Sequence, residues 1–349
     1  MESPDEVGMY ERYPPSNNRL EEGGRRLRGE TKIDQADLPL VSIVTVVRNG
    51  VGTLQRCIDS VQNQSYKNVE HIVIDGGSTD GTLDVINSND SALDYFISEP
   101  DSGIYAAMNK GIRLSHGCYL AMVNSDDWLT LDGAEKSVRA LEESDADFSV
   151  GYANVFNECG EHFHTWEIGN FDDRILVSGT SFCHQAVFAH KACYNSVGLY
   201  DESLRISADY KWVKSLFLSG KKAAFINESV VNFSYTGLTV THRHKWKEEA
   251  KELLRETFPF VQPDEANDLV EYVYRDGALT LGLLPLLQRG RENNQFLVSV
   301  GMLLMQRLVE AEARLKKLEA SRPAAEGTSP KSLLRRIIRK LGRLSKSGT

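Results

Sequence analysis

The sequence predicts an α/β fold: a doubly wound, mostly parallel sheet with helices on both faces, followed by a C-terminal helical region. Continuous β-branched and apolar runs, such as 41–47 and 119–124, are typical of strands that are covered on both faces. Segments with helical spacing of apolar residues alternate with these runs, and this cadence favours a parallel sheet. From residue 245 onward the pattern is helical.

The elements follow one another regularly in the first half and less regularly afterwards. The first four strands are predicted at 41–47, 70–75, 95–100 and 119–124. Helices are predicted at 53–64, from residue 82 and at 105–115. The second half offers strands at 147–156 and 223–235 and a helix at 210–218.

Composition then divides the chain into four segments. The first 38 residues are polar, charged and irregular, so we expect them to be disordered. We therefore predict a disordered segment at 1–38, an α/β catalytic domain at 39–244, a helical extension at 245–320, and a linker with a basic helix at 321–349.

The totals exclude several classes of protein. The 349 residues are 41% hydrophobic and carry a net charge of -9, which argues against general nucleic-acid binding. Five cysteines without a C-x-x-C pair argue against a disulfide framework or a thiolate zinc site. No apolar run approaches the ~20 residues of a membrane span, and the acidic N-terminus is unlike a signal peptide. We therefore expect a cytoplasmic protein, at most peripheral on the inner face of the cytoplasmic membrane.

Polar or charged residues directly follow four of the predicted strands. They are Arg48 with Asn49, Asp75, the segment 99–101, and Asp126 with Asp127. In open parallel sheets, ligands bind in the crevice beyond the carboxyl ends of the strands. We expect these four strand ends to converge on one ligand site.

The stretch Asn124-Ser125-Asp126-Asp127 places two adjacent carboxylates at the end of a buried strand, where they repel each other and resist desolvation. A divalent cation takes oxygen ligands, stabilises such a pair and can bridge phosphates. The alternative is a turn in which an Asp caps a helix. The position, four strands into a parallel sheet, favours the metal site.

Two further stretches provide candidates for ligand contact. The glycines of IVIDGGSTDGT lack the spacing of a dinucleotide or Walker loop. The stretch is either a tight strand-to-helix turn or a site where Asp75 accepts a hydrogen bond from a base-ring N–H. SEPDSGIYAAMNKGI adds Asp101, Asn109 and Lys110. Lys110 is either solvated surface or, facing the same crevice, a contact to a diphosphate or base.

Together these stretches resemble glycosyltransferase family 2, the nucleotide-sugar transferases with the GT-A fold. The similarity covers roughly residues 40–235 and rests on VSIVTVVRNG, HIVIDGGSTDGT, ISEPDSGIYAAMNKGI, MVNSDDW and LYDESLRISADYKW. Each piece alone is unspecific, but their order and spacing are specific. The chain resembles in particular bacterial members that build cell-surface polysaccharides or glycolipids.

The resemblance implies roles for individual residues. Asn124-Ser125-Asp126 would replace the family's D-x-D, with Asp126 as the chief ligand of Mn²⁺ or Mg²⁺ and Asp127 as a supplement. Asp209, in SADY, matches the catalytic base, and one carboxylate within ~3 Å of an acceptor hydroxyl suffices for that role. A helix N-cap is its other interpretation. The residues implied on the nucleotide-sugar side are Thr45, Arg48, Asp75, Ser78, Asp101, Asn109, Lys110, Asn124 and Ser125.

Three histidines complete the candidate set. TSFCHQAVF matches a segment that lines the acceptor side in the family, which implies a place there for His184 and Gln185, although a lone His is more often structural. His242 or His244, in THRHKW, could add a third metal ligand.

We therefore hypothesise a metal-dependent inverting glycosyltransferase. It would move a sugar from a nucleotide-diphosphate sugar, with uridine as the expected base, to a saccharide or lipid-linked acceptor. A nucleotidyltransferase shares such a sheet and acidic site, but no Gly-rich triphosphate loop follows the first strand. An inactive nucleotide-sugar-binding module is the third alternative, against which Asp126 and Asp209 argue. The sugar, the acceptor and a homo-oligomer formed through the helical region stay open.

The tail 331–346 has a distinct pattern of its own. Six apolar residues lie on one face of a helix there, and seven Lys or Arg residues occupy the other face without any acid. This pattern predicts a helix that lies on an anionic membrane. A solvated or disordered basic tail is the alternative, and nucleic acid is disfavoured because no aromatic residue interleaves the charges.

Overall fold

The computed structural model describes residues 10–168, 171–178, 182–235, 242–274 and 290–304, together with Leu286 and Ala313. The chain divides into two compact units, residues 1–301 and 302–349. The first unit contains the sheet and the helices that cover it. Of the second unit, only residues 302–304 and Ala313 are described.

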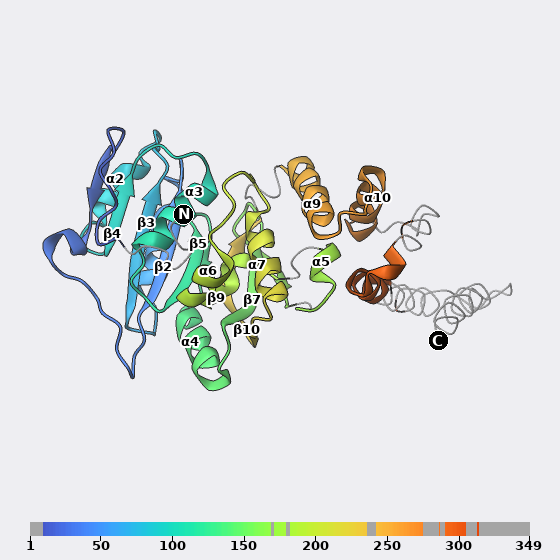
Figure 1. The fold of residues 1–349 in the computed structure, drawn as a ribbon. Helices are drawn as coiled ribbons and strands as arrows, with labels where there is room; N and C mark the ends of the chain where they lie inside the picture. The colour runs from blue at the N-terminus through green and yellow to red at the C-terminus, as the bar shows by residue number, and fades with distance from the viewer. Residues whose placement is uncertain are drawn as a thin grey trace, which may run out of the picture. The chain divides into compact units, whose positions relative to one another are not determined.

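The first unit is built on one mixed sheet, which in the described residues has ten strands (Figure 1). The strand order is β1-β4-β3-β2-β5-β9-β7-β10-β6. Strand β8 stands outside this order and pairs with β7. Their bounds are β1 Glu21–Gly23, β2 Val41–Val47, β3 Val69–Asp75, β4 Tyr95–Ser98, β5 Tyr119–Asn124, β6 Trp128–Leu129, β7 Phe148–Phe156, β8 His162–Trp166, β9 Val187–His190 and β10 Ala223–Ser234.

The centre of the sheet is parallel, as the sequence predicts. Strands β4, β3, β2 and β5 are all parallel, and Val41 lies opposite Val69 in β3 and Tyr119 in β5. Strand β9 runs antiparallel between β5 and β7, whereas β7 and β10 are parallel to each other. The predicted doubly wound, mostly parallel sheet is therefore confirmed, and β9 is an antiparallel strand that the sequence analysis did not predict.

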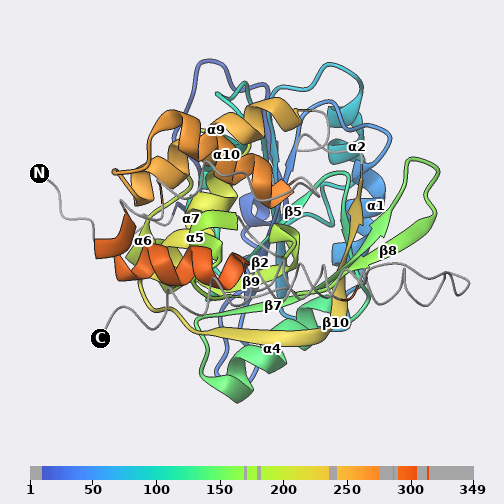
Figure 2. The same cartoon turned by 90° about the vertical axis from the view of Figure 1, so that its right-hand side faces the viewer.

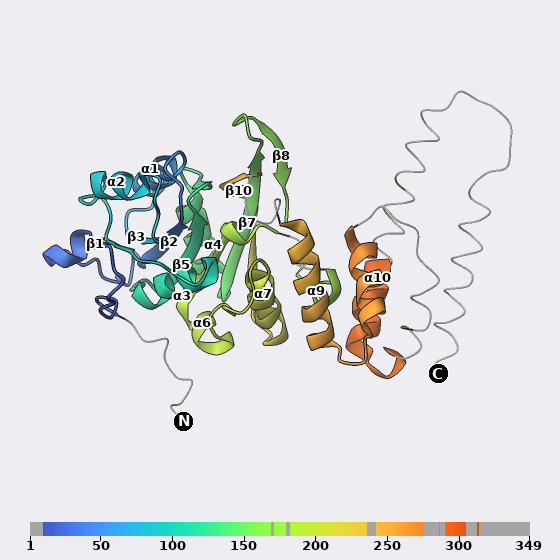
Figure 3. The ribbon, with the colours of Figure 1, turned by 90° about the horizontal axis from the view of Figure 1, so that it is seen from above.

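Helices cover both faces of the parallel strands. They are α1 Leu54–Gln62, α2 Thr82–Ser88, α3 Ile104–Leu114, α4 Gly133–Ser144, α5 Ile175–Ser178, α6 Lys191–Val197, α7 Ala208–Leu218, α9 Arg243–Thr257 and α10 Pro263–Tyr274, with 3-10 turns η1 Arg25–Arg28, η2 His184–Ala186 and η3 Gly290–Glu292. Figure 3 shows α1 and α2 on one side of the strands and α3 on the other.

The alternation of side chains along β2 explains this arrangement. All seven residues of β2 are buried, which is the pattern of a strand covered on both faces. Val41 and Ile43 pack in one cluster with Cys57 and other residues on the α1 face. On the opposite face Gly111 of α3 approaches so closely that a Cβ there would lie 2.2 Å from Val44 Cγ1. A glycine at 111 therefore lets α3 lie directly on the sheet.

The N-terminal segment is more ordered than the sequence analysis predicts. Strand β1 pairs antiparallel with β4, and Arg26, only 7% exposed, forms an ion pair of 2.8 Å with Glu70. Arg26 also donates to the carbonyl of Leu114 at 2.8 Å. The prediction of disorder over 1–38 is corrected for residues 20–28, because these charges are compensated inside the fold rather than solvated. Residues 1–9 lie outside the described residues.

The helical extension also begins as part of the first unit. Helix α9 lies beside α7 (Figure 2), and Lys214 of α7 donates to the carbonyl of Leu253 at 3.1 Å and to Thr257 Oγ1 at 2.7 Å. The two compact units divide at residue 301, so residues 245–301 belong to the same unit as the sheet. The predicted linker and basic helix at 321–349 lie outside the described residues. In the part of the chain that the structure describes, no helix is long and apolar enough to cross a membrane.

Candidate functional site

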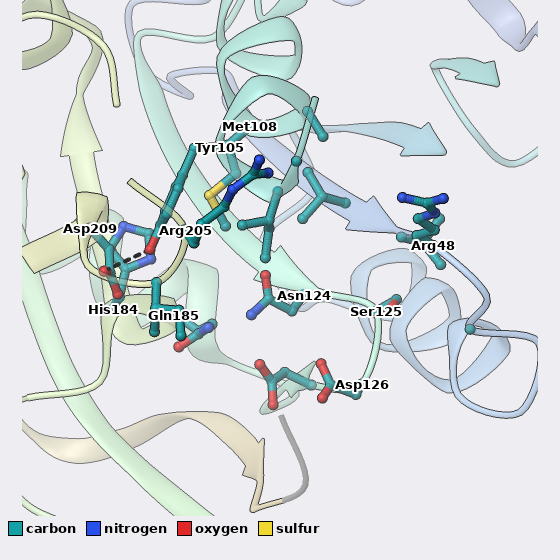
Figure 4. A pocket seen from close by; sticks show the side chains of 18 of the residues that line it. Arg48, Tyr105, Met108, Asn124, Ser125, Asp126, His184, Gln185, Arg205 and Asp209 are labelled. Carbon is teal, nitrogen blue, oxygen red and sulfur yellow. Dashed lines mark hydrogen bonds between the residues drawn. The ribbon is translucent and has the colours of Figure 1, made fainter. Parts of the chain in front are cut away.

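A cavity of about 890 Å³ opens beyond the carboxyl ends of β2 and β5. It lies where the switch-point rule for parallel sheets places a ligand. Side chains from the first strands, from η2 and from α7 converge on it, as Figure 4 shows. The predicted site residues that line it are Arg48, Asp101, Asn124, Ser125, Asp126, Asp127, His184, Gln185 and Asp209.

The acidic wall of the cavity comes from the turn that follows β5. Asp126 is half-buried, and burial raises its pKa. Asp127 is only 1% exposed, and burial together with the charge of Asp126 raises its pKa well above the usual range. Arg56 supports the turn by donating to the Asp126 carbonyl at 2.9 Å, with its guanidinium 3.6 Å from the centre of the Trp128 ring.

Two buried oxygens in this turn lack a hydrogen-bond partner among the described residues. Asp127 Oδ1 accepts a hydrogen bond from the Ser234 N–H at 2.8 Å, but Asp127 Oδ2 and Asn124 Oδ1 have none. Buried oxygens of this kind are costly unless a ligand satisfies them. The described residues include no group of three or more His, Cys, Asp or Glu with metal-binding geometry. One or two carboxylates completed by substrate phosphates are, however, the usual environment of Mg²⁺, so the residues present fit such a cation.

The opposite wall carries Asp209, in the first turn of α7. Its Oδ1 accepts hydrogen bonds from the Tyr105 hydroxyl at 3.1 Å and from the Tyr210 N–H at 2.9 Å. Burial and the nearby Asp209 carboxylate raise the pKa of Tyr105, which therefore stays a protonated donor. Both of these bonds go to Oδ1, which leaves Oδ2 of Asp209 as the oxygen with capacity for a further proton or hydrogen bond.

Local chain geometry brings Tyr105 to this position. Gly103, the residue before α3, has a φ of 143°, which a residue with a side chain rarely adopts. A Cβ at this residue would also lie 3.1 Å from Arg205 Nη1. The glycine thus lets the chain turn into α3 beneath the Arg205 guanidinium, which donates to the carbonyl of Ser102 at 2.7 Å.

His184 and Gln185 form the floor of the cavity near Asp209. His184 is 7% exposed, and its Nε2 lies 2.7 Å from the Tyr200 hydroxyl. Burial lowers its pKa, so the imidazole is neutral at physiological pH. Gln185 Oε1 accepts a hydrogen bond from Cys183 Sγ at 3.0 Å. Among the described residues the Gln185 amide nitrogen has no hydrogen-bond partner, so it is a donor that can face a ligand.

Three predicted donor-side residues serve the packing of the fold instead. Thr45 points toward α1, where its Oγ1 lies 3.0 Å from His71 Nε2, because side chains alternate along β2. Asn109 joins α3 to a later loop by accepting from the Tyr200 N–H and donating to its carbonyl, each at 2.9 Å. Lys110 forms a buried ion pair with Glu99. In this structure a partner from another element holds each side chain away from the cavity, and contact of these three residues with the donor stays a prediction.

Asp75 and Ser78 lie beside the cavity without lining it. Asp75 is fully buried, and its two oxygens accept hydrogen bonds from the Ser78 hydroxyl and N–H and, at 2.6 Å, from the Ser98 hydroxyl. The predicted contact between Asp75 and a nucleotide base stays a prediction.

Several lining residues were missed by the sequence analysis. Tyr105 and Met108 lie one turn apart in α3, inside a stretch already singled out, so helical spacing could have found them. Arg205 and Lys245 also line the cavity, and no local pattern marks them. Of the two histidines considered as metal ligands, His242 lines the cavity, whereas His244 lies 3.1 Å from Glu248.

Comparison with known proteins gives a consistent picture. Residues 42–188 match the family model "Glycosyl transferase family 2". The chain is 32% identical over 176 residues to a PGL/p-HBAD biosynthesis glycosyltransferase of Mycobacterium tuberculosis, which covers 49% of this chain and 67% of that protein. It is 32% identical over 133 residues to the glycosyltransferase GlyA of Streptococcus pneumoniae, covering 37% of this chain and 19% of that protein.

The fold likewise has solved counterparts. The structure of S. aureus TarS residues 1–349 in complex with UDP-GlcNAc superposes with a TM-score of 0.52 at 13% identity, covering 75% of this chain and 80% of that chain. At this identity the likeness concerns the fold alone. It agrees with the mixed sheet and its covering helices.

Proposed function

The chain belongs to glycosyltransferase family 2 and uses a nucleotide-sugar donor, and from this premise we propose that it is a metal-dependent, inverting hexosyltransferase. The observation that carries the proposal is one cavity with two acidic sites, Asp126 with Asp127 on one wall and Asp209 on the other. Inverting transfer needs both an acidic site for the departing diphosphate's counter-cation and a base for the acceptor.

On the donor side, we propose that Asp126 holds a divalent cation, Mn²⁺ or Mg²⁺, with Asp127 in support. When bound, the cation would neutralise charge on the donor diphosphate. Arg48, exposed at the end of β2, and Asp101 line the same cavity as Ser125 and are proposed to contact the nucleotide. The structural counterpart TarS was solved with UDP-GlcNAc, which supports a UDP-sugar as the donor to test first.

On the acceptor side, we propose that Asp209 removes the proton of the attacking hydroxyl. Oδ1 is held by Tyr105, so Oδ2 is the oxygen that would accept this proton. The acceptor oxygen forms a bond to the anomeric carbon as the bond to the diphosphate oxygen breaks, and the nucleoside diphosphate departs. Attack from the face opposite the leaving group inverts the anomeric centre. His184 and Gln185 would orient the acceptor.

For the acceptor we propose a saccharide or a lipid-linked saccharide used in cell-surface glycan assembly. The name of the mycobacterial relative, a PGL/p-HBAD biosynthesis glycosyltransferase, supports a biosynthetic role of this kind. The tail 331–346, which lies outside the described residues, carries seven Lys or Arg residues and no acid. We propose that it holds the protein on an anionic membrane surface.

A panel of nucleotide sugars, assayed for release of nucleoside diphosphate with and without Mn²⁺, tests the proposal. Asp126→Ala should abolish release that depends on the metal, and Asp209→Asn should lower turnover by ~10²-fold or more with donor affinity nearly preserved. Glu143→Gln, an exposed change on α4, serves as the control and should behave like the wild type. Full activity in EDTA would refute the metal, and collapse of donor binding in Asp209→Asn would refute the base.

A further inference from the structure

The N-terminus of α7, which carries Asp209, is held by a residue from another helix. Ser207 occupies the N-cap position but makes no side-chain cap hydrogen bond, and its buried Oγ has no partner among the described residues. The backbone donors just before the helix are instead satisfied by Glu249 of α9. Glu249 thus satisfies the backbone donors of the segment that leads into α7 and ties this segment to α9.

The contacts of Glu249 are specific to this short segment. Its Oε1 accepts a hydrogen bond from the Arg205 N–H at 2.8 Å, and its Oε2 accepts from the Ile206 and Ser207 N–H groups, each at 3.0 Å. Glu249 is 2% exposed, so this carboxylate is buried, and all three of these bonds go to the backbone. Three charge-assisted bonds to consecutive N–H groups fix the path of the chain two residues before Asp209.

The same helix also reaches the cavity directly. Lys245, which lines the cavity, precedes Glu249 by four residues, so the two lie on one face of α9. Figure 3 shows α9 running beside α7. Helix α9 lies beyond residues 42–188, the part that matches the family model, and its Glu249 sits 40 residues after Asp209 in the chain.

We propose that Glu249 is a positioning residue for catalysis, which acts through Asp209 by fixing the start of α7. The inference rests on the proposed role of Asp209 as the base. Two groups then place the Asp209 carboxylate: Tyr105 holds its Oδ1 from α3, and Glu249 holds the backbone before it from α9. Misplacing a catalytic group by about 1 Å can cost on the order of 10² in rate, so loss of either contact should be visible in turnover.

The test uses Glu249→Gln in the full chain. The amide keeps the size of the side chain, but its nitrogen faces a backbone N–H and cannot accept from it. With the nucleotide sugar that gives the fastest release of nucleoside diphosphate, we expect kcat to fall about 10- to 100-fold. Affinity for UDP, measured by calorimetry, should stay within about twofold. Amide hydrogen exchange at 205–207 should become faster.

Two comparisons separate positioning from mere stability. Lys214→Met removes another contact between α7 and α9, to the Leu253 carbonyl and Thr257 Oγ1, and should leave kcat within about twofold. In an Asp209→Asn background, Glu249→Gln should cause no further loss, because residues that act as one unit are not additive.

The outcomes are distinct. An unchanged kcat in Glu249→Gln, an equal loss in Lys214→Met, or an additive loss in the double variant would overturn the role of Glu249 while leaving the proposed function intact. Wild-type turnover in Asp209→Asn would instead overturn the proposed base, and with it this inference.

Discussion

Replacing Asp127 by Asn should make the ligand-free protein more stable and the enzyme worse. Asp127 is 1% exposed, its Oδ1 accepts a hydrogen bond from the Ser234 N–H, and its Oδ2 has no partner among the described residues. Its pKa is raised by burial first and by the neighbouring Asp126 second. Asn retains an oxygen that accepts from the Ser234 N–H. It removes the carboxylate charge, which burial and the neighbouring Asp126 both disfavour.

The gain in the free energy of unfolding can be worked out from the cost of burying the Asp127 carboxylate. An unsatisfied buried polar group costs ~1–3 kcal/mol, and more when it is charged. The Asn amide nitrogen is itself a buried donor that needs a partner, and this reduces the gain in stability. We therefore expect a gain of about 1–2 kcal/mol, which for a protein of this size is roughly 1–3 °C in Tm.

Thermal unfolding with and without ligand measures both sides of the effect. Without metal, Asp127→Asn should melt above the wild type, and Asp126→Asn should gain less because Asp126 is only half-buried. With Mn²⁺ and UDP in excess the order should reverse, since a ligand at 100 times its Kd adds ~2.7 kcal/mol to a protein that binds it. Glu143→Gln controls for the change in net charge.

A lower Tm for metal-free Asp127→Asn would refute the reasoning. It would mean that the Asp127 carboxylate is satisfied inside the fold and contributes to its stability. An equal response of wild type and variant to Mn²⁺ and UDP would separately show that Asp127 does not support the cation.

Four further predictions concern other parts of the molecule. Tyr105→Phe should lower kcat about tenfold with unchanged UDP affinity, because the bond to the candidate base is lost; an unchanged kcat contradicts this. Arg26→Met should cost ~3–5 kcal/mol in urea unfolding by leaving Glu70 buried without its partner, whereas a neutral result would show that water replaces Arg26. Burial lowers the pKa of Lys214 from 10.5 to about 8, so the folded state loses this proton first. Stability should therefore rise between pH 8 and 10.5 by up to ~3 kcal/mol, and Lys214→Met should lack that rise. Deletion of 331–349 should release the protein from anionic liposomes in flotation while sparing donor hydrolysis, and equal flotation would contradict the membrane proposal.

The sheet and the acidic wall could be predicted because their signals are local. A continuous apolar run of seven residues such as 41–47 has few interpretations other than a doubly covered strand. The acidic turn follows such a run directly, so its place at a strand end was fixed once the strand was recognised. The role of Asp209 as a base could be predicted only from the family resemblance, because SADY alone is equally typical of a helix N-terminus.

Sequence reasoning is weakest where a partner from another part of the chain decides where a side chain lies. Lys110 was expected to face the ligand, but Glu99 pairs with it inside the fold. Arg26 was placed in a disordered segment because its partner Glu70 is 44 residues away. Glu249 went unnoticed for the same reason, since its acceptor role depends on a backbone segment that no spacing rule connects with it. Whether a charged side chain is buried depends on its contacts in the folded chain. A local sequence pattern does not show contacts between residues that are far apart in the sequence.

The two acidic walls of the cavity differ in how far the protein itself satisfies them. At Asp127 and Asn124 buried oxygens are left without a partner among the described residues, which is a cost that binding of a cation would offset. At Asp209 one oxygen is held by Tyr105 and the preceding backbone is held by Glu249, while Oδ2 is left with capacity to accept. A site that must bind a charged ligand gains from unsatisfied oxygens, since the ligand completes them. A base gains from being positioned, since it must accept a proton at one atom and release it again. This contrast in hydrogen bonding, rather than the count of carboxylates, supports the assignment of the cation to one wall and of the proton transfer to the other.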